Sequence, residues 1–288
     1  MMSKQESSQR DSQPLSKPSI PKIYSYQHDV LDRIDRLPAD FKVQTLGVIP
    51  GSSGEKHPLL VIRRTVDRSV PTILVSAGVH GEEPAGVFAL LDFLEGGSGQ
   101  LDRKKLNLLA LPCINPVGFE YGVRFGSGGV DLNRNFKSDT VQPENLLVQR
   151  AIAQAGGPFL ATLDLHEIDP EWSAEGFVAS DNPRDFYLYE CCEQKERRIG
   201  HHLVAAAEQI SPACKWDRIY LDKNSGGVVW YPEGAANPVY ALGTTLEGYL
   251  QAGYTKHAFT LETPAGLPIS VRVRLQRSFL ETAIQHLA

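Results

Sequence analysis

Short runs of apolar residues, each followed at once by polar residues, are the clearest pattern along the chain. The runs lie at 72–76, 106–111, 159–163 and 257–261. Their length and the turn residues that bound them predict buried strands. The polar clusters that follow are Gly78-Val79-His80, Asn115-Pro116, Asp164-Leu165-His166-Glu167 and Glu262-Thr263-Pro264.

Stretches between these runs predict helices at 84 to about 94, 144–155, 185–210 and 271–287. Pro84 suits the first turn of its helix. Strands that alternate with helices predict an α/β fold, an α/β/α sandwich with a mixed, mostly parallel central sheet. Functional sites in such sheets collect at the carboxyl ends of the strands. We therefore expect the four polar clusters to converge in one crevice.

Length and composition limit the kinds of protein that this chain can form. With 288 residues, 42% of them hydrophobic and 22% charged, the chain can bury a sizeable core. The first 22 residues are polar and rich in Ser, Pro and Lys, which predicts a disordered leader rather than a signal peptide, followed by a single domain over 23–288. No apolar run reaches the ~18 residues of a membrane span, so we expect a cytoplasmic protein with no membrane partner.

Charge and cysteine content exclude further classes. The net charge of -5 argues against nucleic acid as a partner, because a phosphate backbone requires clustered Lys and Arg. Cys113, Cys191, Cys192 and Cys214 form no CxxC pair and suit neither a disulfide framework nor a structural zinc ribbon. We interpret them as reduced thiols, with Cys191 and Cys192 in the helix predicted over 185–210.

The cluster His80-Gly81-Glu82-Glu83 is a candidate metal site. An imidazole and a carboxylate on one turn after a strand can both reach one cation, and three protein ligands leave a position for water. Spacing alone does not choose between Glu82 and Glu83, and an isolated HxxE is more often a solvated surface turn. His166 at the end of a second strand would be the third ligand, although a lone histidine there is more often a hydrogen-bonded core residue.

Two further clusters carry charge. Arg124 and Arg134 could each grip a carboxylate or a developing oxyanion with two hydrogen bonds, while the alternative for 131–136 is a structural turn in which Asn and Asp bind loop backbone. Glu262 ends an apolar strand, where loss of water raises the pKa of a carboxyl group towards the range of a general base. An ion pair with a neighbouring cation is the alternative for Glu262.

Taken in order, these motifs resemble those of the carboxypeptidase A-like zinc metallocarboxypeptidases, which are related to the aspartoacylase and succinylglutamate desuccinylase group. The motifs are His80-x-x-Glu83, Asn115-Pro116-Val117-Gly118, Arg124, Asp131-Leu132-Asn133-Arg134-Asn135-Phe136, His166 and Glu262. They span roughly 73–264, which is most of the chain. The resemblance implies a zinc carboxypeptidase-like fold.

The resemblance also implies a role for each matched residue. One Zn²⁺ per chain would be bound by His80, Glu83 and His166, which selects Glu83 over Glu82. The other roles are the terminal carboxylate grip (Asn133, Arg134), oxyanion stabilisation (Arg124), support of His80 (Asp131) and general base followed by general acid (Glu262).

The family also has a mobile tyrosine that closes over the bound peptide end. Tyr240 has the best spacing for this catalytic role, and Tyr249 and Tyr254 are its rivals. The segment 242–254 would line the specificity pocket, with Leu246 or Glu247 facing the substrate side chain next to the cut. An inward leucine would favour apolar residues and an inward glutamate basic ones.

The implied function is hydrolysis of C-terminal peptide bonds, with murein peptides among the candidate substrates. The first alternative is an enzyme of the aspartoacylase and succinylglutamate desuccinylase type, which releases an acyl group from an N-acyl amino acid. Either substrate would carry a free carboxylate. The second alternative, from a different class, is a non-catalytic module that binds zinc or carboxylates.

Overall fold

The computed structural model describes residues 21–51, 54–173, 176–231 and 244–287. Eight strands of this part form one mixed sheet in the order β1-β2-β4-β3-β5-β10-β6-β9, and two short strands form a separate sheet. The strands are β1 (Lys42–Pro50), β2 (Lys56–Arg64), β3 (Thr72–Ala77), β4 (Asn107–Leu111), β5 (Ala161–Ile168), β6 (Tyr187–Cys192), β7 (Arg218–Ile219), β8 (Asp222–Lys223), β9 (Val228–Tyr231) and β10 (His257–Pro264). The α-helices are α1 (Asp32–Ile34), α2 (Pro84–Glu95), α3 (Gly99–Lys104), α4 (Pro116–Tyr121), α5 (Pro143–Ala155), α6 (Gly200–Ala207), α7 (Leu246–Gly253) and α8 (Ile269–Leu287).

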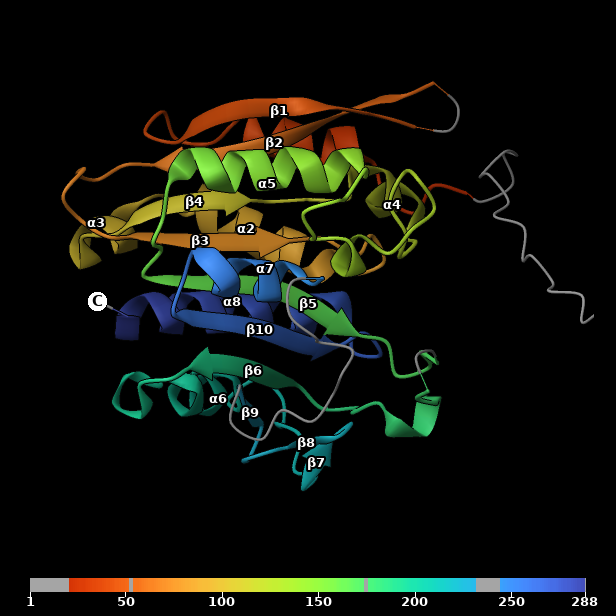
Figure 1. Cartoon of the computed structure of the whole chain (residues 1–288), viewed down its shortest axis with the longest axis vertical. Helices are drawn as coiled ribbons and strands as arrows, with labels where there is room; N and C mark the ends of the chain where they lie inside the picture. The colour runs from red at the N-terminus through yellow and green to blue at the C-terminus, as the bar shows by residue number, and fades with distance from the viewer. Residues whose placement is uncertain (1–20, 52–53, 174–175, 232–243, 288) are drawn as a thin grey trace, which may run out of the picture.

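Helices cover both faces of the large sheet (Figure 1). On one face α2, α3 and α6 pack around α8, and on the other α5 lies against β1 and β2 while α7 lies against β5 and β10. The central strands β4, β3, β5 and β10 are parallel neighbours, and β1, β2 and β6 add antiparallel pairs. The predicted sandwich with a mixed, mostly parallel sheet is confirmed.

The four strands expected from apolar runs are these four central strands. Their burial on both faces explains the continuous apolar pattern, because helices shield each side. The helices expected at 84–94, 144–155 and 271–287 correspond to α2, α5 and α8. In α2 the ring of Pro84 occupies the first turn, where its missing N–H costs no hydrogen bond.

The helix predicted over 185–210 is wrong in its first half. Residues 187–192 form β6, all of them buried, between β10 and β9, and the α-helix spans only 200–207. Periodicity cannot separate a short, fully buried apolar run from a helix. Cys191 and Cys192 are buried free thiols as expected, but they lie in this strand and not in a helix.

The antiparallel pair β1–β2 was not foreseen and extends the sheet by two strands ahead of β3. Residues 1–20 of the expected leader lie outside the described residues. Among the described helices, none combines the length and the apolar content that crossing a bilayer requires.

Candidate active site

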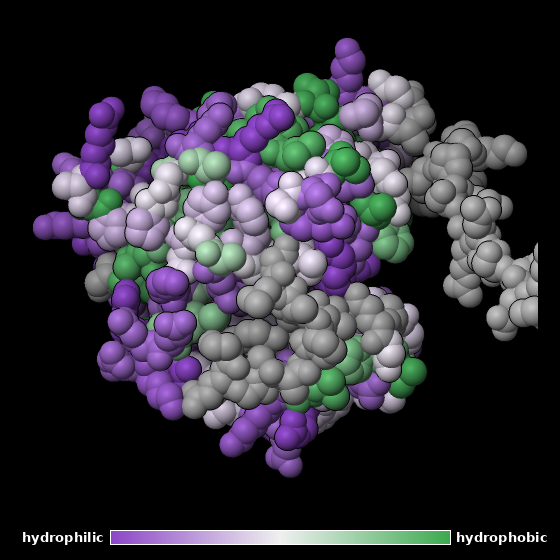
Figure 2. Space-filling view, viewed as in Figure 1, coloured by the Kyte–Doolittle hydropathy of each residue, from purple (hydrophilic) through white to green (hydrophobic). Residues whose placement is uncertain are grey.

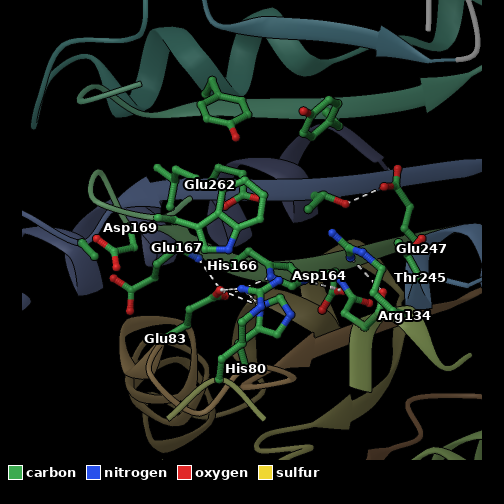
Figure 3. A pocket seen from close by; sticks show the side chains of 18 of the residues that line it. His80, Glu83, Arg134, Asp164, His166, Glu167, Asp169, Thr245, Glu247 and Glu262 are labelled. Atoms are coloured by element: carbon green, nitrogen blue, oxygen red, sulfur yellow. Dashed lines mark hydrogen bonds and ion pairs between the residues drawn. The ribbon is translucent and has the colours of Figure 1, made fainter. Parts of the chain in front are cut away.

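One cavity opens at the carboxyl ends of the central parallel strands, where the sequence predicted convergence. Its lining includes these residues predicted for the site: His80, Glu83, Arg124, Asn133, Arg134, His166, Glu247 and Glu262. In Figure 3 the imidazoles of His80 and His166 and the carboxylate of Glu83 point toward one another at the centre. The geometry at that centre is that of a metal site.

The three central side chains offer donor atoms that all lie within 4.8 Å of one another. Nδ1 of His80 is 2.6 Å from one carboxylate oxygen of Glu83, and Nδ1 of His166 is 2.9 Å from the other. All three residues are buried. Burial raises the pKa of the Glu83 carboxyl, but the neighbouring histidines outweigh it and hold that pKa well below its usual range. Glu83 therefore stays ionised, which is the state in which a carboxylate can bind a metal ion.

A carboxylate supports each histidine from behind. Nε2 of His80 lies 3.2 Å from Asp131, the partner that the sequence suggested, and Nε2 of His166 lies 3.0 Å from Asp164. Ser76 donates to the second oxygen of Asp164 at 2.7 Å. Such partners place the ring proton on Nε2 and leave the Nδ1 lone pair for a cation. Two imidazoles and one carboxylate, oriented in this way, are a donor set that fits Zn²⁺.

The turn that carries Glu83 is fixed by buried polar contacts. Glu83 precedes Pro84 at the start of α2, and its carboxylate accepts a hydrogen bond from the backbone N–H of Glu167 at 3.0 Å. The Glu167 side chain accepts from the N–H of Ala85 at 2.8 Å and pairs with Arg272 of α8. These contacts join α2, β5 and α8 behind the metal ligands.

The NPxG motif positions the segment that contains Arg124. Asn115 caps α4 by accepting from the N–H of Gly118 at 2.8 Å, and its amide donates to the carbonyls of Arg124 and Phe125. Gly81 of the metal-binding turn lies so close to Gly118 that a Cβ on Gly81 would fall 2.0 Å from the Gly118 carbonyl carbon. Only glycine fits there.

Arg124 lies beside the metal site. Its Nε donates to Asp131 at 2.9 Å, and its Nη1 is 3.5 Å from Glu82 and 3.7 Å from Glu83. Asp131 thus contacts both Arg124 and His80 and holds the guanidinium at the edge of the cavity. A polarised carbonyl oxygen between the metal position and Arg124 would be stabilised from both sides.

Glu262 lies in β10, directly opposite His166 of β5 in the strand register. Its carboxyl group lines the cavity. Burial raises the pKa of Glu262 to about 7, although the charge of His166 opposes this. A carboxyl group with that pKa, one strand away from His166 of the candidate metal site, can accept and return a proton near neutral pH.

The expected substrate-binding residues lie on one side of the metal centre. In Figure 3, Arg134, Thr245 and Glu247 are grouped to the right of His166 and His80. Asn133 accepts a hydrogen bond from the N–H of Leu246 at 2.8 Å and so ties the start of α7 to the 131–136 turn.

Leu246 and Glu247 face opposite ways. The Leu246 side chain is fully buried in an apolar cluster under α5 and α7 and does not line the described cavity. Glu247 lines the cavity and accepts hydrogen bonds from Thr260 at 2.7 Å and Gln251 at 3.0 Å. Burial raises the pKa of Glu247 to about 7. Of Leu246 and Glu247, the two candidates for contact with the substrate side chain, Glu247 lines the cavity.

Tyr240 lies outside the described residues. Its rivals Tyr249 and Tyr254 are in contact with each other, with their hydroxyl groups 3.3 Å apart, and Tyr249 packs near Phe136. Neither belongs to the described cavity lining.

Sequence reasoning missed Asp164 and a group of cavity aromatics. Asp164 could have been found, because residues two apart on a strand share a face and His166 is two positions on. The aromatics are Trp172, Phe177, Tyr187, Tyr189 and Tyr220. They come from segments without a recognisable motif, so only the fold assembles them.

Comparisons with known proteins place the chain in a family. The succinylglutamate desuccinylase/aspartoacylase catalytic domain matches residues 69–270, which include every metal-site residue named above. The chain belongs to the succinylglutamate desuccinylase/aspartoacylase family. Murein peptide amidase A of Escherichia coli K12 is 33% identical over 102 residues, which are 35% of this family member and only 40% of that relative.

Solved structures extend the likeness to nearly the whole chain. A candidate metallopeptidase from Shewanella denitrificans is 24% identical, with a TM-score of 0.71 over 91% of this chain and 89% of that one. A metallo-carboxypeptidase from Burkholderia cenocepacia is 18% identical, with a TM-score of 0.60 over 89% of this chain and 66% of that one. The likeness to these structures shows that this member of the succinylglutamate desuccinylase/aspartoacylase family has the zinc carboxypeptidase-like fold.

Proposed function

We propose that the protein is a zinc-dependent metallocarboxypeptidase that removes a C-terminal residue with a positively charged side chain. The observation that carries this proposal is the position of Glu247 in the same cavity as the metal triad, Glu262 and Arg134. These groups supply a site for a cationic side chain, a proton-transfer group and a grip for a terminal carboxylate.

The zinc ion would be held by His80, Glu83 and His166. When bound, zinc acidifies water and polarises the substrate carbonyl. Glu262 takes the proton of the attacking water, for which its raised pKa suits it. Arg124 donates hydrogen bonds to the oxygen on which negative charge develops. Glu262 then returns the proton to the leaving amine.

The substrate is held on the side of Arg134. The Arg134 guanidinium binds the terminal carboxylate, helped by the side-chain amide of Asn133, whose oxygen is already engaged by Leu246. Glu247 receives the cationic side chain. A carboxyl group whose pKa is about 7 becomes fully ionised beside a bound ammonium or guanidinium group, because an opposite charge favours the charged form.

The aspartoacylase or succinylglutamate desuccinylase activity is the second candidate. The family match over 69–270 favours it, since enzymes of that type need the same triad and a carboxylate grip. Murein peptides are a candidate substrate for either activity, as suggested by the name of the Escherichia coli relative. The proposed cation site at Glu247 distinguishes the peptidase, because an N-acyl aspartate would bring a second carboxylate to it.

The test is hydrolysis by the zinc-loaded protein, followed by mass spectrometry. The substrates are a peptide ending in lysine, the same peptide ending in leucine, its C-terminal amide and N-acetylaspartate. We expect the lysine peptide to lose its last residue, the leucine peptide to react more slowly and the amide to be inert. Exclusive cleavage of N-acetylaspartate would establish the second candidate, and stoichiometric zinc without any turnover would indicate a non-catalytic module.

The Glu247→Gln variant tests the role of that carboxylate. It should lower kcat/KM for the lysine peptide by about tenfold or more, because one partner of a charge pair is lost. The leucine peptide is the internal control and should react as before. Equal losses with both peptides would remove Glu247 from side-chain selection.

A further inference from the structure

The cavity continues on the far side of the metal centre from Glu247. Figure 3 shows Glu167 and Asp169 to the left of His80 and His166, while Arg134 and Glu247 lie to the right. The chain that follows Asp169 bends back at once, because Trp172 donates its backbone N–H to the Asp169 carbonyl at 3.1 Å. Trp172 therefore stays close to Asp169 and lines the same cavity.

Two aromatic side chains that follow β5, five positions apart, meet a third from the turn between β7 and β8. The ring centroid of Tyr220 lies 4.7 Å from that of Phe177 and 6.4 Å from that of Trp172, with an edge-to-face arrangement in both pairs. All three residues line the cavity and are only half-buried. Such rings present flat apolar surface to whatever enters the cavity. We call Trp172, Phe177 and Tyr220 the aromatic wall.

The backbone at Tyr220 has a conformation that a bulky residue rarely adopts. Tyr220 lies at the turn between β7 and β8 with φ of 52°, in the left-handed region. That conformation suits glycine or asparagine, and a bulky residue there is strained. The tyrosine hydroxyl donates to Asn182 at 3.0 Å, and the Asn182 amide donates to the carbonyls of Asp169 and Trp172. Asn182 thus fastens Tyr220 to the loop that carries Trp172.

Apolar surface continues outward from the aromatic wall. Val178, Trp216 and Leu221 are among the exposed large hydrophobic residues, 55%, 44% and 44% exposed, and each is close in sequence to the wall or to the β7–β8 turn. Figure 2 shows several hydrophobic residues at the lower right, beside the polar residues at the bottom, where Figure 1 places β7 and β8. Exposed apolar residues thus accompany the aromatic wall along the chain.

We infer that the aromatic wall is the binding site for an apolar or aromatic side chain on the acyl side of the scissile bond. The inference rests on the proposed function, in which the terminal carboxylate and the cationic side chain occupy the side of Arg134 and Glu247. The scissile carbonyl then lies at the metal centre, so the acyl part of the substrate extends towards Trp172 and Tyr220. The protein therefore selects peptides with a bulky apolar residue before the cut, not amino acids with a small acetyl group.

Binding to the zinc-loaded Glu262→Gln protein tests this inference, because the ligand then stays intact. The two ligands are N-acetyl-Phe-Lys and N-acetyl-Gly-Lys, which differ only on the acyl side, and calorimetry gives both dissociation constants. We expect the Phe ligand to bind about tenfold more tightly, as a buried aromatic contact allows.

Two substitutions at Tyr220 separate the ring from the hydroxyl group. Tyr220→Asn tolerates the left-handed backbone but removes the ring, and it should abolish most of the preference for the Phe ligand. Tyr220→Phe keeps the ring, loses the hydrogen bond to Asn182 and should retain the preference. Trp172→Ala provides a second test should Tyr220→Asn fail to fold, as judged by its thermal melting.

Each outcome is decisive. Equal binding of the two ligands, a preference that survives Tyr220→Asn, or no binding of either ligand would overturn the aromatic wall as a substrate site. A Tyr220-dependent preference without peptide hydrolysis by the Glu262-containing protein would support the binding site and refute the proposed activity. Peptide hydrolysis without a preference for the Phe ligand would support the proposed activity and refute the aromatic wall as a substrate site.

Discussion

Replacing Asp164 should weaken zinc binding without touching a metal ligand. Asp164 accepts from His166 Nε2 at 3.0 Å and from Ser76 at 2.7 Å, and it is buried. In Asp164→Asn the side-chain oxygen can still face His166 while the amide nitrogen faces the Ser76 oxygen, so only the charge is lost. In Asp164→Ala both hydrogen bonds are lost and the ring is no longer held.

The expected losses follow from these contacts. Partners of metal-bound histidines contribute about 10- to 100-fold to metal affinity, and charge-assisted hydrogen bonds are about twice as strong as neutral ones. We therefore expect zinc affinity to fall about tenfold in Asp164→Asn and about 100-fold in Asp164→Ala, or about 1.4 and 2.7 kcal/mol. Competition with a chromophoric chelator measures both values.

The pH dependence of zinc affinity tests the same role of Asp164. Burial lowers the pKa of His166, but Asp164 and Glu83 outweigh it and raise that pKa well above its usual value. Protons therefore compete with zinc more strongly in the wild type than in Asp164→Asn, and the gap between them should widen as the pH rises. The matched control is Glu247→Gln, which changes another cavity carboxylate and should bind zinc normally. Wild-type zinc affinity in Asp164→Ala would refute the supporting role of Asp164.

The remaining predictions concern catalysis, pH and stability. Glu262→Gln should retain zinc, by metal analysis, and lose about 10²- to 10⁴-fold in kcat; wild-type turnover would exclude Glu262 as the base. The kcat/KM of the wild type should rise with pH as Glu262 loses its proton, with an inflection at or below about 7 because bound zinc lowers the pKa further; the same inflection in the residual activity of Glu262→Gln would assign it to another group. Phe279→Ala should lower the free energy of unfolding in urea by about 3–5 kcal/mol, because Phe279 is fully buried with its ring 5.4 Å from that of Phe186. Val141→Ala, at a residue 79% exposed, is its control and should change little.

The fold was predictable where burial of a strand produces a continuous apolar run in the sequence. The runs before His80 and His166 are buried on both faces, so most of their positions are apolar and the strand is visible in the sequence. The same reasoning failed at 187–192, because a short, fully buried run has no period to separate strand from helix. The β1–β2 pair also escaped prediction, because most of β1 is exposed and burial therefore leaves no continuous apolar run there.

The site was predictable in part for a related reason. Polar residues that end buried strands must meet at one edge of a parallel sheet, which brings His80, His166 and Glu262 together. Sequence spacing left Glu82 and Glu83 as equal candidates until the resemblance selected Glu83, and the structure places Glu83 between the two imidazoles.

By itself, the sequence determined the class of fold, the strands whose ends carry the candidate site residues and the order of those residues along the chain, because these depend on local burial and on connectivity. Tertiary structure alone decided that Asp164 supports His166, that Glu247 and not Leu246 lines the cavity, and that Tyr220 meets Trp172. These are contacts between side chains from separate segments. The direction in which each side chain points depends on helix rotation, on strand register and, at Tyr220, on a left-handed backbone conformation. The linear pattern of residues does not encode these features.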